Sequence, residues 1–523
     1  MPIGEELEND IANPEYQKKV ILEQSPELLK PISDFASKIY SSPHDPKFPD
    51  IQPRALLVGG FVRDSLLGKH PKDADLEVYG VSPERLVELL TQMFPDKVDM
   101  VGQQFGILKV YANEGIEFDV SIPRRESKSG TGHKGFVIQS DPAMSIEEAG
   151  RRRDFTWNAL AADPMTGEVF DYFNGVSDLE NKVLRVTDPE RFKDDPLRVM
   201  RALQFAARYN FSVEPESLKL MQEMVAENQL AELPAERMTS EFEKLLLKGE
   251  KPSVGFELAR DLGIIEKHYP ELHVLIDTAQ EPEWHPEGDV WIHTMMVVDA
   301  AAKIIRQEER GFTQQEKLEV MLGALCHDLG KPATTKVIDG KIRSLAHEEA
   351  GVEPTRSFLA KLKFGEDVSR SAEIIAAHHL KPGQHYREFV EKKNIDEKTY
   401  INILRRLLKH ISPVSWKVLS ACSESDSRGR TIPGIDTAPY GPGETMAKVI
   451  IENKLDIAAK TNLISGKDIF EVAERLGKKV RGGKKFGECI KIIEEKRDNQ
   501  EISTKEEALL ILEEMLLDNF FAK

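Results

Sequence analysis

The chain has 523 residues, of which 40% are hydrophobic, and a formal net charge of -18. Its length is enough for three or four domains, and no apolar run is long enough to span a membrane. The N-terminus lacks the charged-then-apolar pattern of a secretory signal, and the three cysteines have no metal or redox spacing, which favours a reducing cytoplasm. The acidic total disfavours strong nonspecific binding to RNA.

The first element with a chemical meaning is a strand, a glycine turn and a helix. Residues 1–50 are predicted to be a polar extension with a helix around Pro26–Tyr40, followed by a proline-rich loop. Arg54–Val58 is then a short apolar strand, and Phe61–Leu67 is a helix that ends at Gly68. Between them, Gly59-Gly60 allows a tight turn that can approach a phosphate, so the start of the helix would face a triphosphate.

Acidic side chains follow on the next strands. If Lys72–Tyr79 is a strand, Asp73 and Asp75 lie on one face about 7 Å apart, and both can reach a metal pair separated by roughly 4 Å. A hairpin of Gly106–Tyr111 and Ile116–Ile122, turning at Asn113-Glu114-Gly115, adds Asp119. Glu117 shares the face of Asp119, so alternation does not choose between them. The pattern suits phosphoryl or nucleotidyl transfer.

The run from Gly59 to Gly68 with Asp73-Ala74-Asp75 resembles the head of the bacterial class II tRNA nucleotidyltransferase/poly(A) polymerase family. Further motifs follow in family order over residues 54 to about 215: 124–135 resembles the flexible loop, 152–159 the next block and 194–202 the nucleotide-selecting helix. The resemblance implies two-metal transfer with Mg²⁺, with CTP, ATP and the tRNA 3′ end as partners. It also implies the catalytic residues Asp73, Asp75 and Asp119 and the nucleotide-binding residues Gly59, Gly60, Arg63, Arg153, Asp154, Asn158, Asp195, Arg198 and Arg201.

Asp195 and Arg198 can be interpreted from hydrogen-bond chemistry alone. A carboxylate only accepts and a guanidinium only donates, so the two form an acceptor-donor edge one helical turn apart. Cytosine and adenine each present an amine next to a ring acceptor, whereas uracil and guanine present a carbonyl there, so such an edge selects C and A. An ordinary surface ion pair has the same spacing. Similar enzymes commonly have an arginine where Gln204 stands, which leaves a weaker triphosphate contact or a shifted specificity open.

A second constellation lies downstream. His293 falls in the apolar run Val290–Ile304, His327-Asp328 ends the apolar run Val320–Cys326, and Asp426 follows about 100 residues later. Imidazole and carboxylate suit a divalent metal. With His327-Asp328-Leu329-Gly330-Lys331, the set resembles the HD metal phosphohydrolase superfamily, which implies a transition metal or Mg²⁺ held by His293, His327, Asp328 and Asp426. His347 and the tandem His378-His379 fall where two-metal HD proteins place extra ligands, and of these His347 and His378 are the further candidate ligands.

These patterns predict an α+β multidomain chain. The expected order is an N-terminal extension (1–50), a mixed α/β nucleotidyltransferase head (51–185), an all-α neck and body that binds RNA (186–280), an all-α HD domain (281–430) and a helical tail (431–523). From Thr187 onward no strands are expected. Linkers are predicted at Thr278–Pro286 and Ile432–Gly443, and the last helix at Thr504–Leu517.

The favoured function is CCA addition to tRNA, with hydrolysis of phosphate ends by the HD domain. A poly(A) polymerase, or an enzyme that adds only CC or only A, shares the head motifs and remains an alternative. A second alternative makes the HD domain the working part, hydrolysing a nucleotide, with the head as a nucleotide-sensing module. Oligomeric state has no sequence signal.

Overall fold

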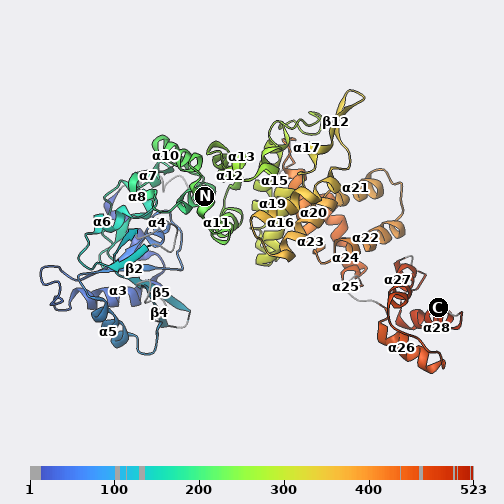
Figure 1. The fold of residues 1–523 in the computed structure, drawn as a ribbon, viewed down its shortest axis with the longest axis horizontal. Helices are drawn as coiled ribbons and strands as arrows, with labels where there is room; N and C mark the ends of the chain where they lie inside the picture. The colour runs from blue at the N-terminus through green and yellow to red at the C-terminus, as the bar shows by residue number, and fades with distance from the viewer. Residues whose placement is uncertain are drawn as a thin grey trace. The chain divides into compact units, whose positions relative to one another are not determined.

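The computed structural model describes residues 13–99, 107–113, 115–128, 136–435, 437–458, 463–498, 501–502, 504–518 and 520–521. The chain divides into two compact units, Met1–Ile264 and Ile265–Lys523, both drawn in Figure 1. The expectations for the chain start, Gly106, Glu114 and residues 129–135 of the flexible loop lie outside the described residues. Among the helices that are described, none combines the length and apolarity needed to cross a bilayer.

A seven-stranded sheet with the order β3-β4-β5-β2-β1-β8-β9 organises the first unit (Figure 1). β2 and β5 are parallel and the other neighbours are antiparallel. The strands are β1 Arg54–Val58, β2 Asp75–Tyr79, β3 Val98–Asp99, β4 Ile107–Asn113, β5 Ile116–Ser121, β8 Ala161–Ala162 and β9 Val169–Phe170, and a separate pair joins β6 Arg124–Lys128 to β7 Phe136–Ser140. The predicted mixed α/β head is confirmed.

Helices cover this sheet where the sequence is amphipathic. The predicted helix Pro26–Tyr40 is confirmed as α3, which buries Leu28, Ile32, Phe35 and Ile39 at helical spacing and packs against β1. The other helices of this region are α2 Pro14–Glu23, α4 Gly60–Leu66, α5 Pro83–Met93, α6 Ile146–Arg151, η2 Thr156–Asn158, α7 Gly175–Glu180 and α8 Pro189–Phe192.

The second strand of the head begins later than expected. β2 starts at Asp75, so the prediction of a strand from Lys72 was wrong by three residues. The reason is the turn at Gly59: β1 ends at Val58, which is paired with Asp75, and no residue of β1 remains to pair with Asp73. On the other side, only the Ala74 carbonyl continues the ladder, accepting from the Asp119 amide at 2.9 Å.

The neck is helical, as predicted, with one exception. It contains α9 Leu197–Tyr209, α10 Pro215–Ala226, η3 Gln229–Glu232, α11 Ala235–Lys248 and α12 Pro252–Asp261, and α9 packs against both α11 and α12. The expectation of no strands after Thr187 was wrong here, because β11 Ser212–Val213 pairs in parallel with β10 Val183–Leu184. The strand β11 has only two residues, and so short a run does not show the alternation of side chains that predicts a strand.

A bundle of four helices forms the centre of the second unit. α15 Val290–Ile304, α16 Gln314–Cys326, α20 Glu366–His378 and α23 Trp416–Arg428 pack on one another. The domain is not entirely helical, since β12 Thr335–Ile338 and β13 Lys341–Ser344 form a hairpin turning at Asp339-Gly340. This hairpin carries the turn signal Asp-Gly, which the prediction of strand-free sequence overlooked.

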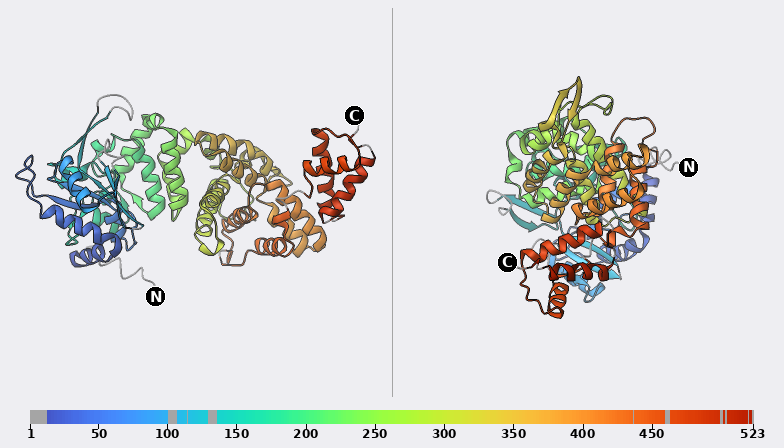
Figure 2. Two further views of the ribbon diagram at one scale, coloured as in Figure 1. Left: turned by 90° about the horizontal axis from the view of Figure 1, so that it is seen from below. Right: turned by 90° about the vertical axis from the view of Figure 1, so that its right-hand side faces the viewer.

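The remaining helices complete the unit (Figure 2). They are α13 Ile264–His268, α14 Pro270–His273, η4 Glu308–Arg310, α17 Lys331–Thr334, α18 His347–Ala350, α19 Val352–Lys361, α21 Lys381–Tyr386, η5 Arg387–Glu391, α22 Glu397–Ile411, α24 Gly441–Glu452, α25 Leu455–Ala458, α26 Gly466–Arg475, α27 Lys484–Asp498 and α28 Lys505–Leu517. The last three bury a small core of their own that includes Ile469, Ile493 and Leu512. The predicted final helix is confirmed, with Thr504 as its N-cap.

Candidate functional sites

Three carboxylates gather at one end of the head sheet. Asp75 opens β2 and is in register with Asp119 on the parallel strand β5, and Asp73 lies two residues before Asp75. Asp73 and Asp75 are exposed and Asp119 is half-buried. Desolvation, together with the negative charges of Asp119 and Asp73, raises the pKa of Asp75 despite the nearby Arg153. Desolvation also raises the pKa of Asp119, despite Lys109. A divalent cation would relieve this repulsion, so the set fits one.

The strand register separates the two acidic candidates on β5. Asp119 is the register partner of Asp75, whereas Glu117 lies further along the strand opposite Tyr111. Glu117 accepts a hydrogen bond from Lys109 at 3.0 Å, and the Lys109 ammonium is 3.9 Å from Asp119. Asp119 is therefore the acid of β5 that stands beside Asp75.

The glycine turn next to these carboxylates has a specific geometry. Gly59 has φ 62° and ψ -118°, and a Cβ placed there would lie 3.1 Å from the Arg153 guanidinium. Arg153 in turn donates to Glu77 of β2 at 3.0 Å, and Glu77 also accepts from the Tyr79 hydroxyl at 2.9 Å. The turn, Arg153 and β2 are thus joined in one arrangement beside Asp75, and Gly60 begins α4 directly after the turn.

Four other predicted nucleotide-binding residues form a network with one another. Arg63 is 5% exposed and donates to Asn158 at 2.6 Å, and Asn158 donates to Asp154 at 2.8 Å. Asp154 also accepts from Arg201 at 2.6 Å, and although burial opposes its charged form, Arg201 keeps the pKa of Asp154 below its usual value. Arg63 lies over the Trp157 ring and is fixed by Asp64 at 2.8 Å. In this structure Arg63 therefore positions Asn158 rather than facing solvent.

The proposed base-selecting pair is not an ion pair. Asp195 accepts from the Leu197 amide at 3.1 Å and from Arg237 at 3.0 Å. Arg198 donates to the carbonyl oxygens of Arg191 and Arg152, both at 2.6 Å. Arg237, on α11, is a contact that the sequence did not reveal, because it lies 42 residues from Asp195.

Gln204 differs from these arginines in being inside the protein. It is 3% exposed, and its amide nitrogen has no hydrogen-bond partner within the described part of the chain. It lies on α9, about 1.7 turns after Arg198. Because the Gln204 side chain is buried, having glutamine in place of the usual arginine changes the packed interior of the helical neck and not its surface.

In the second unit, the four helices of the bundle bring together the residues of the HD pattern. His293 of α15 contacts Asp426 of α23, with Nε2 3.1 Å from the carboxylate, and is 3.8 Å from Asp328. Its Nδ1 donates to Glu287 at 2.8 Å. Burial disfavours the charged imidazole, but the hydrogen bonds to Asp426 and Glu287 raise the pKa of His293. Glu287, which the sequence analysis missed, is the carboxylate that orients this ring.

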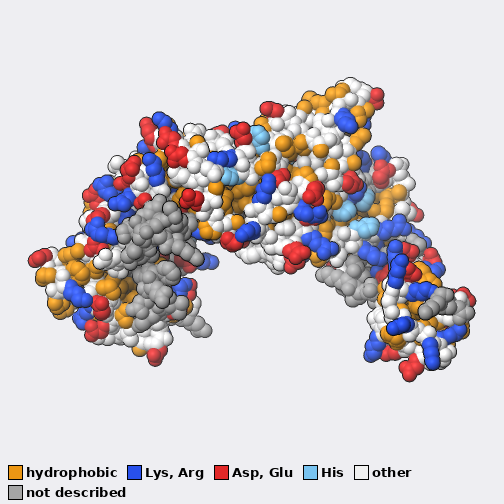
Figure 3. Space-filling model, viewed as in Figure 1, with side chains coloured by type: hydrophobic (Ala, Val, Ile, Leu, Met, Phe, Trp, Pro, Cys, Tyr) orange, Lys and Arg blue, Asp and Glu red, His pale blue; other side chains and the backbone are white. Residues whose placement is uncertain are grey.

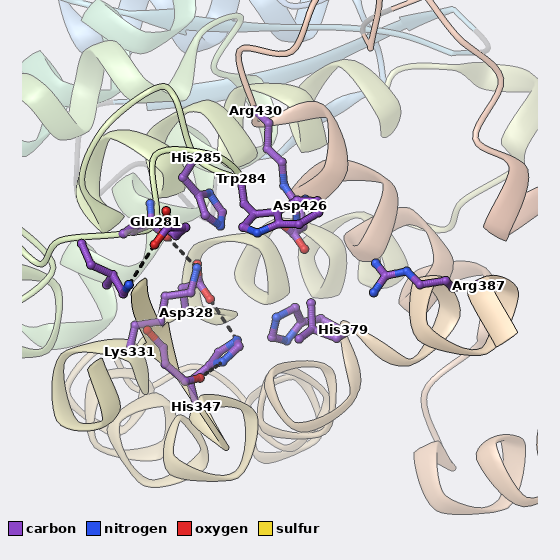
Figure 4. Close-up of a pocket in the computed structure, with 14 residues that line it drawn as sticks. Glu281, Trp284, His285, Asp328, Lys331, His347, His379, Arg387, Asp426 and Arg430 are labelled. Atoms are coloured by element: carbon purple, nitrogen blue, oxygen red, sulfur yellow. Dashed lines mark hydrogen bonds and ion pairs between the residues drawn. The ribbon is translucent and has the colours of Figure 1, made fainter. Parts of the chain in front are cut away.

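Asp328 is the centre of a second group (Figure 4). His327 and His347 have Nε2 atoms 3.1 and 3.3 Å from its carboxylate. Asp328 belongs to two sets of possible ligand atoms that lie within 4.8 Å of one another, one with His293 and His327 and the other with His347 and His379. His327, His347 and His379 each have Nδ1 2.8 Å from a backbone carbonyl oxygen, so Nδ1 carries the proton. Their Nε2 atoms are buried without hydrogen-bond partners among the described residues. Fixed tautomers with free Nε2 atoms are the arrangement that metal-binding histidines require.

Of the tandem His378-His379, His379 lies with Asp328 and His347, and the candidate ligand His378 does not. His378 stacks on His410, with ring centroids 6.4 Å apart. Neighbouring residues on a helix point about 100° apart, so only one histidine of the tandem can face Asp328. Burial lowers the pKa of His379 to about 3, which keeps its imidazole neutral.

Close packing around Gly330 brings His347 to the centre. A Cβ at Gly330 would lie 2.0 Å from the His347 carbonyl oxygen, so only glycine permits this approach. Lys331 follows and places its ammonium 2.6 Å from Asp328. Burial opposes the charged form of Asp328, but His327 and Lys331 hold its pKa well below the usual value. Asp328, His347 and His379 line a cavity of about 270 Å³, whose lining also includes Trp284, Arg387 and Arg430.

Family models match this layout in three consecutive segments. The poly A polymerase head domain matches residues 55–185, the probable RNA and SrmB-binding site of polymerase A matches residues 210–276, and the HD domain matches residues 290–409. Fold and sites together thus define a nucleotidyltransferase head joined to an HD domain.

Similar proteins lead to the same family. The multifunctional CCA protein of Pasteurella multocida (strain Pm70) is 35% identical over 387 residues, which are 73% of this chain and 85% of that protein. The multifunctional CCA protein of Stenotrophomonas maltophilia (strain K279a) is 35% identical over 399 residues, 75% of this chain and 90% of that protein. The chain belongs to the tRNA nucleotidyltransferase/poly(A) polymerase family, together with these proteins.

Solved structures agree on the fold. The Bacillus stearothermophilus CCA-adding enzyme in complex with CTP matches with a TM-score of 0.59 and 22% identity, covering 93% of this chain and 97% of that one. The apo form I of a CCA-adding enzyme matches with a TM-score of 0.57 and 19% identity, covering 96% of both chains.

Proposed function

We propose that this enzyme adds CMP and AMP from CTP and ATP to the 3′ end of tRNA, building or repairing the CCA sequence. The observation that carries the proposal is the register of Asp75 with Asp119 across parallel strands, with Asp73 two residues before Asp75 and the Gly59 turn alongside. The names of the similar proteins, multifunctional CCA protein and CCA-adding enzyme in complex with CTP, support the same substrates.

In this proposal, Asp73, Asp75 and Asp119 would hold two Mg²⁺ ions. The ions, when bound, would activate the RNA 3′-hydroxyl and neutralise charge on the α-phosphate and the departing pyrophosphate. The 3′-hydroxyl gives its proton to solvent water and its oxygen forms a bond to the α-phosphorus. The bond from the α-phosphorus to the oxygen that bridges to the β-phosphate breaks, and pyrophosphate leaves with that oxygen. The protein contributes chiefly by positioning the reactants.

Asp195 and Arg198 are proposed to recognise the base. The contacts of both residues leave capacity for a ligand, because a guanidinium has five N–H donors and Arg198 uses two of them. Asp195 is oriented by Arg237, and a carboxylate has about four acceptor positions, of which two are occupied. Asp195 can therefore accept a hydrogen bond from the exocyclic amine, and Arg198 can donate one to the ring acceptor, that cytosine and adenine share.

The test uses tRNA transcripts that lack CCA, CA or A, supplied with CTP and ATP together or singly, followed by sequencing of the product ends. Asp73→Ala and Asp119→Ala should each lower the rate of CMP incorporation about 10³-fold, the several kcal/mol that a catalytic metal supplies. Glu117→Ala is the matched control on the same strand and should retain activity. Full activity of folded Asp73→Ala, or addition of A alone to a transcript that lacks CCA, would contradict the proposal.

A second activity is proposed for the HD domain: metal-dependent hydrolysis of phosphate or cyclic-phosphate ends, which would prepare damaged RNA ends for addition. The free Nε2 atoms of His327, His347 and His379 around Asp328 favour it. These residues would hold a divalent transition metal or Mg²⁺, which when bound would supply an activated water. His327→Ala should abolish hydrolysis and leave CMP incorporation intact, and Asp73→Ala should do the reverse. Equal loss of both activities in either variant would refute the proposal that the two activities belong to two independent sites.

The cytoplasm is the compartment we propose, because a reducing environment suits the cysteines. Cys326, Cys422 and Cys489 are all unpaired and buried. Burial also raises the pKa of the Cys326 thiol far above its usual value, so this cysteine is not a reactive thiolate.

A further inference from the structure

Trp284 is an exposed aromatic residue at the rim of the HD cavity. The residue is 55% exposed, although tryptophan is normally among the most buried residue types by area. It lines the same cavity as Asp328 and His379 (Figure 4). An exposed aromatic ring beside a candidate metal site is suited to bind a ligand, because a ligand that covers the ring removes its apolar face from water and is stabilised by that burial.

The loop that carries Trp284 is fixed on both sides. The amides of Trp284 and His285 both donate to the Glu281 carbonyl oxygen, at 3.0 and 2.9 Å. The Glu281 side chain accepts from the Ile342 amide of β13 at 2.8 Å, and Glu283 accepts from Lys341 of the same hairpin at 2.7 Å. The ring is therefore presented on a rigid support, which limits the entropy that a ligand must remove.

Two arginines also line the cavity. Arg387, on η5, points toward the cavity in Figure 4, and its side chain is 59% exposed and 4.0 Å from Glu391. Arg430 is 3.4 Å from Asp426. The cavity thus has three parts: carboxylates and imidazoles at its base, a guanidinium on one wall and an aromatic face on another. A nucleotide offers the complementary parts, since it carries a phosphate and a π-faced base.

We propose that Trp284 is the base-binding residue of the HD site: the base of the terminal nucleotide stacks on its ring, while the terminal phosphate lies at Asp328 and Arg387 binds a phosphate oxygen. This inference rests on the hydrolase activity proposed above. The cavity of about 270 Å³ is near the lower end of small-molecule sites, roughly 300 Å³, which suits a single nucleotide. Stacking uses the π-face that every base has, so all four bases are accepted.

The reaction used as a probe is hydrolysis of a cyclic phosphate. Water adds its oxygen to phosphorus, one P–O bond to the ribose breaks, and the released ribose oxygen takes the proton, leaving a phosphomonoester. Adenosine 2′,3′-cyclic phosphate carries a base, and glycerol 1,2-cyclic phosphate has the same reacting ring without one. Both are assayed with the full-length protein loaded with Mn²⁺.

Trp284→Ala should raise the KM for the adenosine substrate about tenfold and leave its kcat nearly unchanged, because the base is bound equally in the ground and transition states. The kinetics of the glycerol substrate should not change. Trp284→Phe should restore most of the affinity, since it keeps an aromatic face. Tyr40→Ala is the control, because Tyr40 is similarly exposed, at 54%, and lies in the other unit of the chain.

Equal effects of Trp284→Ala on both substrates would overturn the base-binding role, as would unchanged kinetics on the adenosine substrate. In either case the hydrolase proposal would stand, because the wild-type protein would still turn over both esters. If the wild-type protein hydrolyses neither ester with Mn²⁺, the hydrolase proposal fails first and the inference fails with it.

Discussion

The two neighbouring glycines of the head make a sharp test, because the structure assigns them opposite tolerances. Gly59→Ala places a side chain at φ 62° and ψ -118°, which costs about 1–3 kcal/mol in backbone strain. The added Cβ would also lie 3.1 Å from the Arg153 guanidinium, which must shift by a few tenths of an ångström and is held by Glu77 at 3.0 Å. We expect a loss of about 2 kcal/mol in the free energy of unfolding, or a fall of about 4–8 °C in Tm for a unit of this size.

Gly60→Ala is the matched control. Gly60 is helical, and a Cβ there would lie 3.6 Å from Arg63, an ordinary van der Waals distance. Its free energy of unfolding should stay the same or rise by about 0.5 kcal/mol. Calorimetry gives Tm, and hydrogen exchange of peptides that cover β1 and α4 reports the head separately from the rest of the chain. Equal destabilisation by the two substitutions would refute the assignment of strain to Gly59.

Three further changes have defined outcomes. Glu287→Gln removes the carboxylate that orients His293 and should weaken Mn²⁺ binding about 10- to 100-fold by calorimetric titration. Arg237→Ala frees Asp195 and should raise the KM for CTP and ATP about tenfold, with little change in Tm because the pair is partly exposed. Desolvation opposes the charged form of Asp468, but hydrogen bonds from Lys505 and Ser465 lower its pKa from 3.8 to about 2, so its contribution to tail stability is present above pH 3.8 and is lost as the pH falls toward 2. Hydrogen exchange of the tail should show that loss in the wild type and not in Asp468→Asn.

The parts of the fold that could be predicted are those with strong local signals. The strand, turn and helix around Gly59 follow from an apolar run, two glycines and a helix-stopping Gly68, and the amphipathic helix at Pro26–Tyr40 follows from its spacing. The start of β2 could not be read in this way. Residues 72–74 have the alternation of a strand, but where pairing begins depends on where β1 ends, which is a long-range property.

The same limit applies to the candidate sites. Alternation left Asp119 and Glu117 equivalent, and only the register of β5 against β2 separates them. Tandem histidines gave no signal for which one faces inward, and the packing of α20 against α16 determines that it is His379. Glu287 had a weak signal, an acid six residues before a buried histidine in a loop rich in proline. Its role depends on the loop folding back so that Glu287 contacts His293 of α15, and no periodic pattern in the local sequence predicts that contact.

The two sites differ in how they would hold a cation, and the difference follows from their elements. The head carboxylates come from strand ends at the edge of a sheet, so Asp73 and Asp75 are exposed and a nucleotide can share their metals. The candidate HD ligands come from closely packed helices, so His293, His327 and Asp328 are almost completely buried, and the ring protons of His293 and His327 are positioned by Glu287 and by a backbone carbonyl oxygen. An open edge suits an ion that arrives with each triphosphate, and a closed bundle suits a resident ion. One chain can therefore carry both chemistries without either site borrowing ligands from the other.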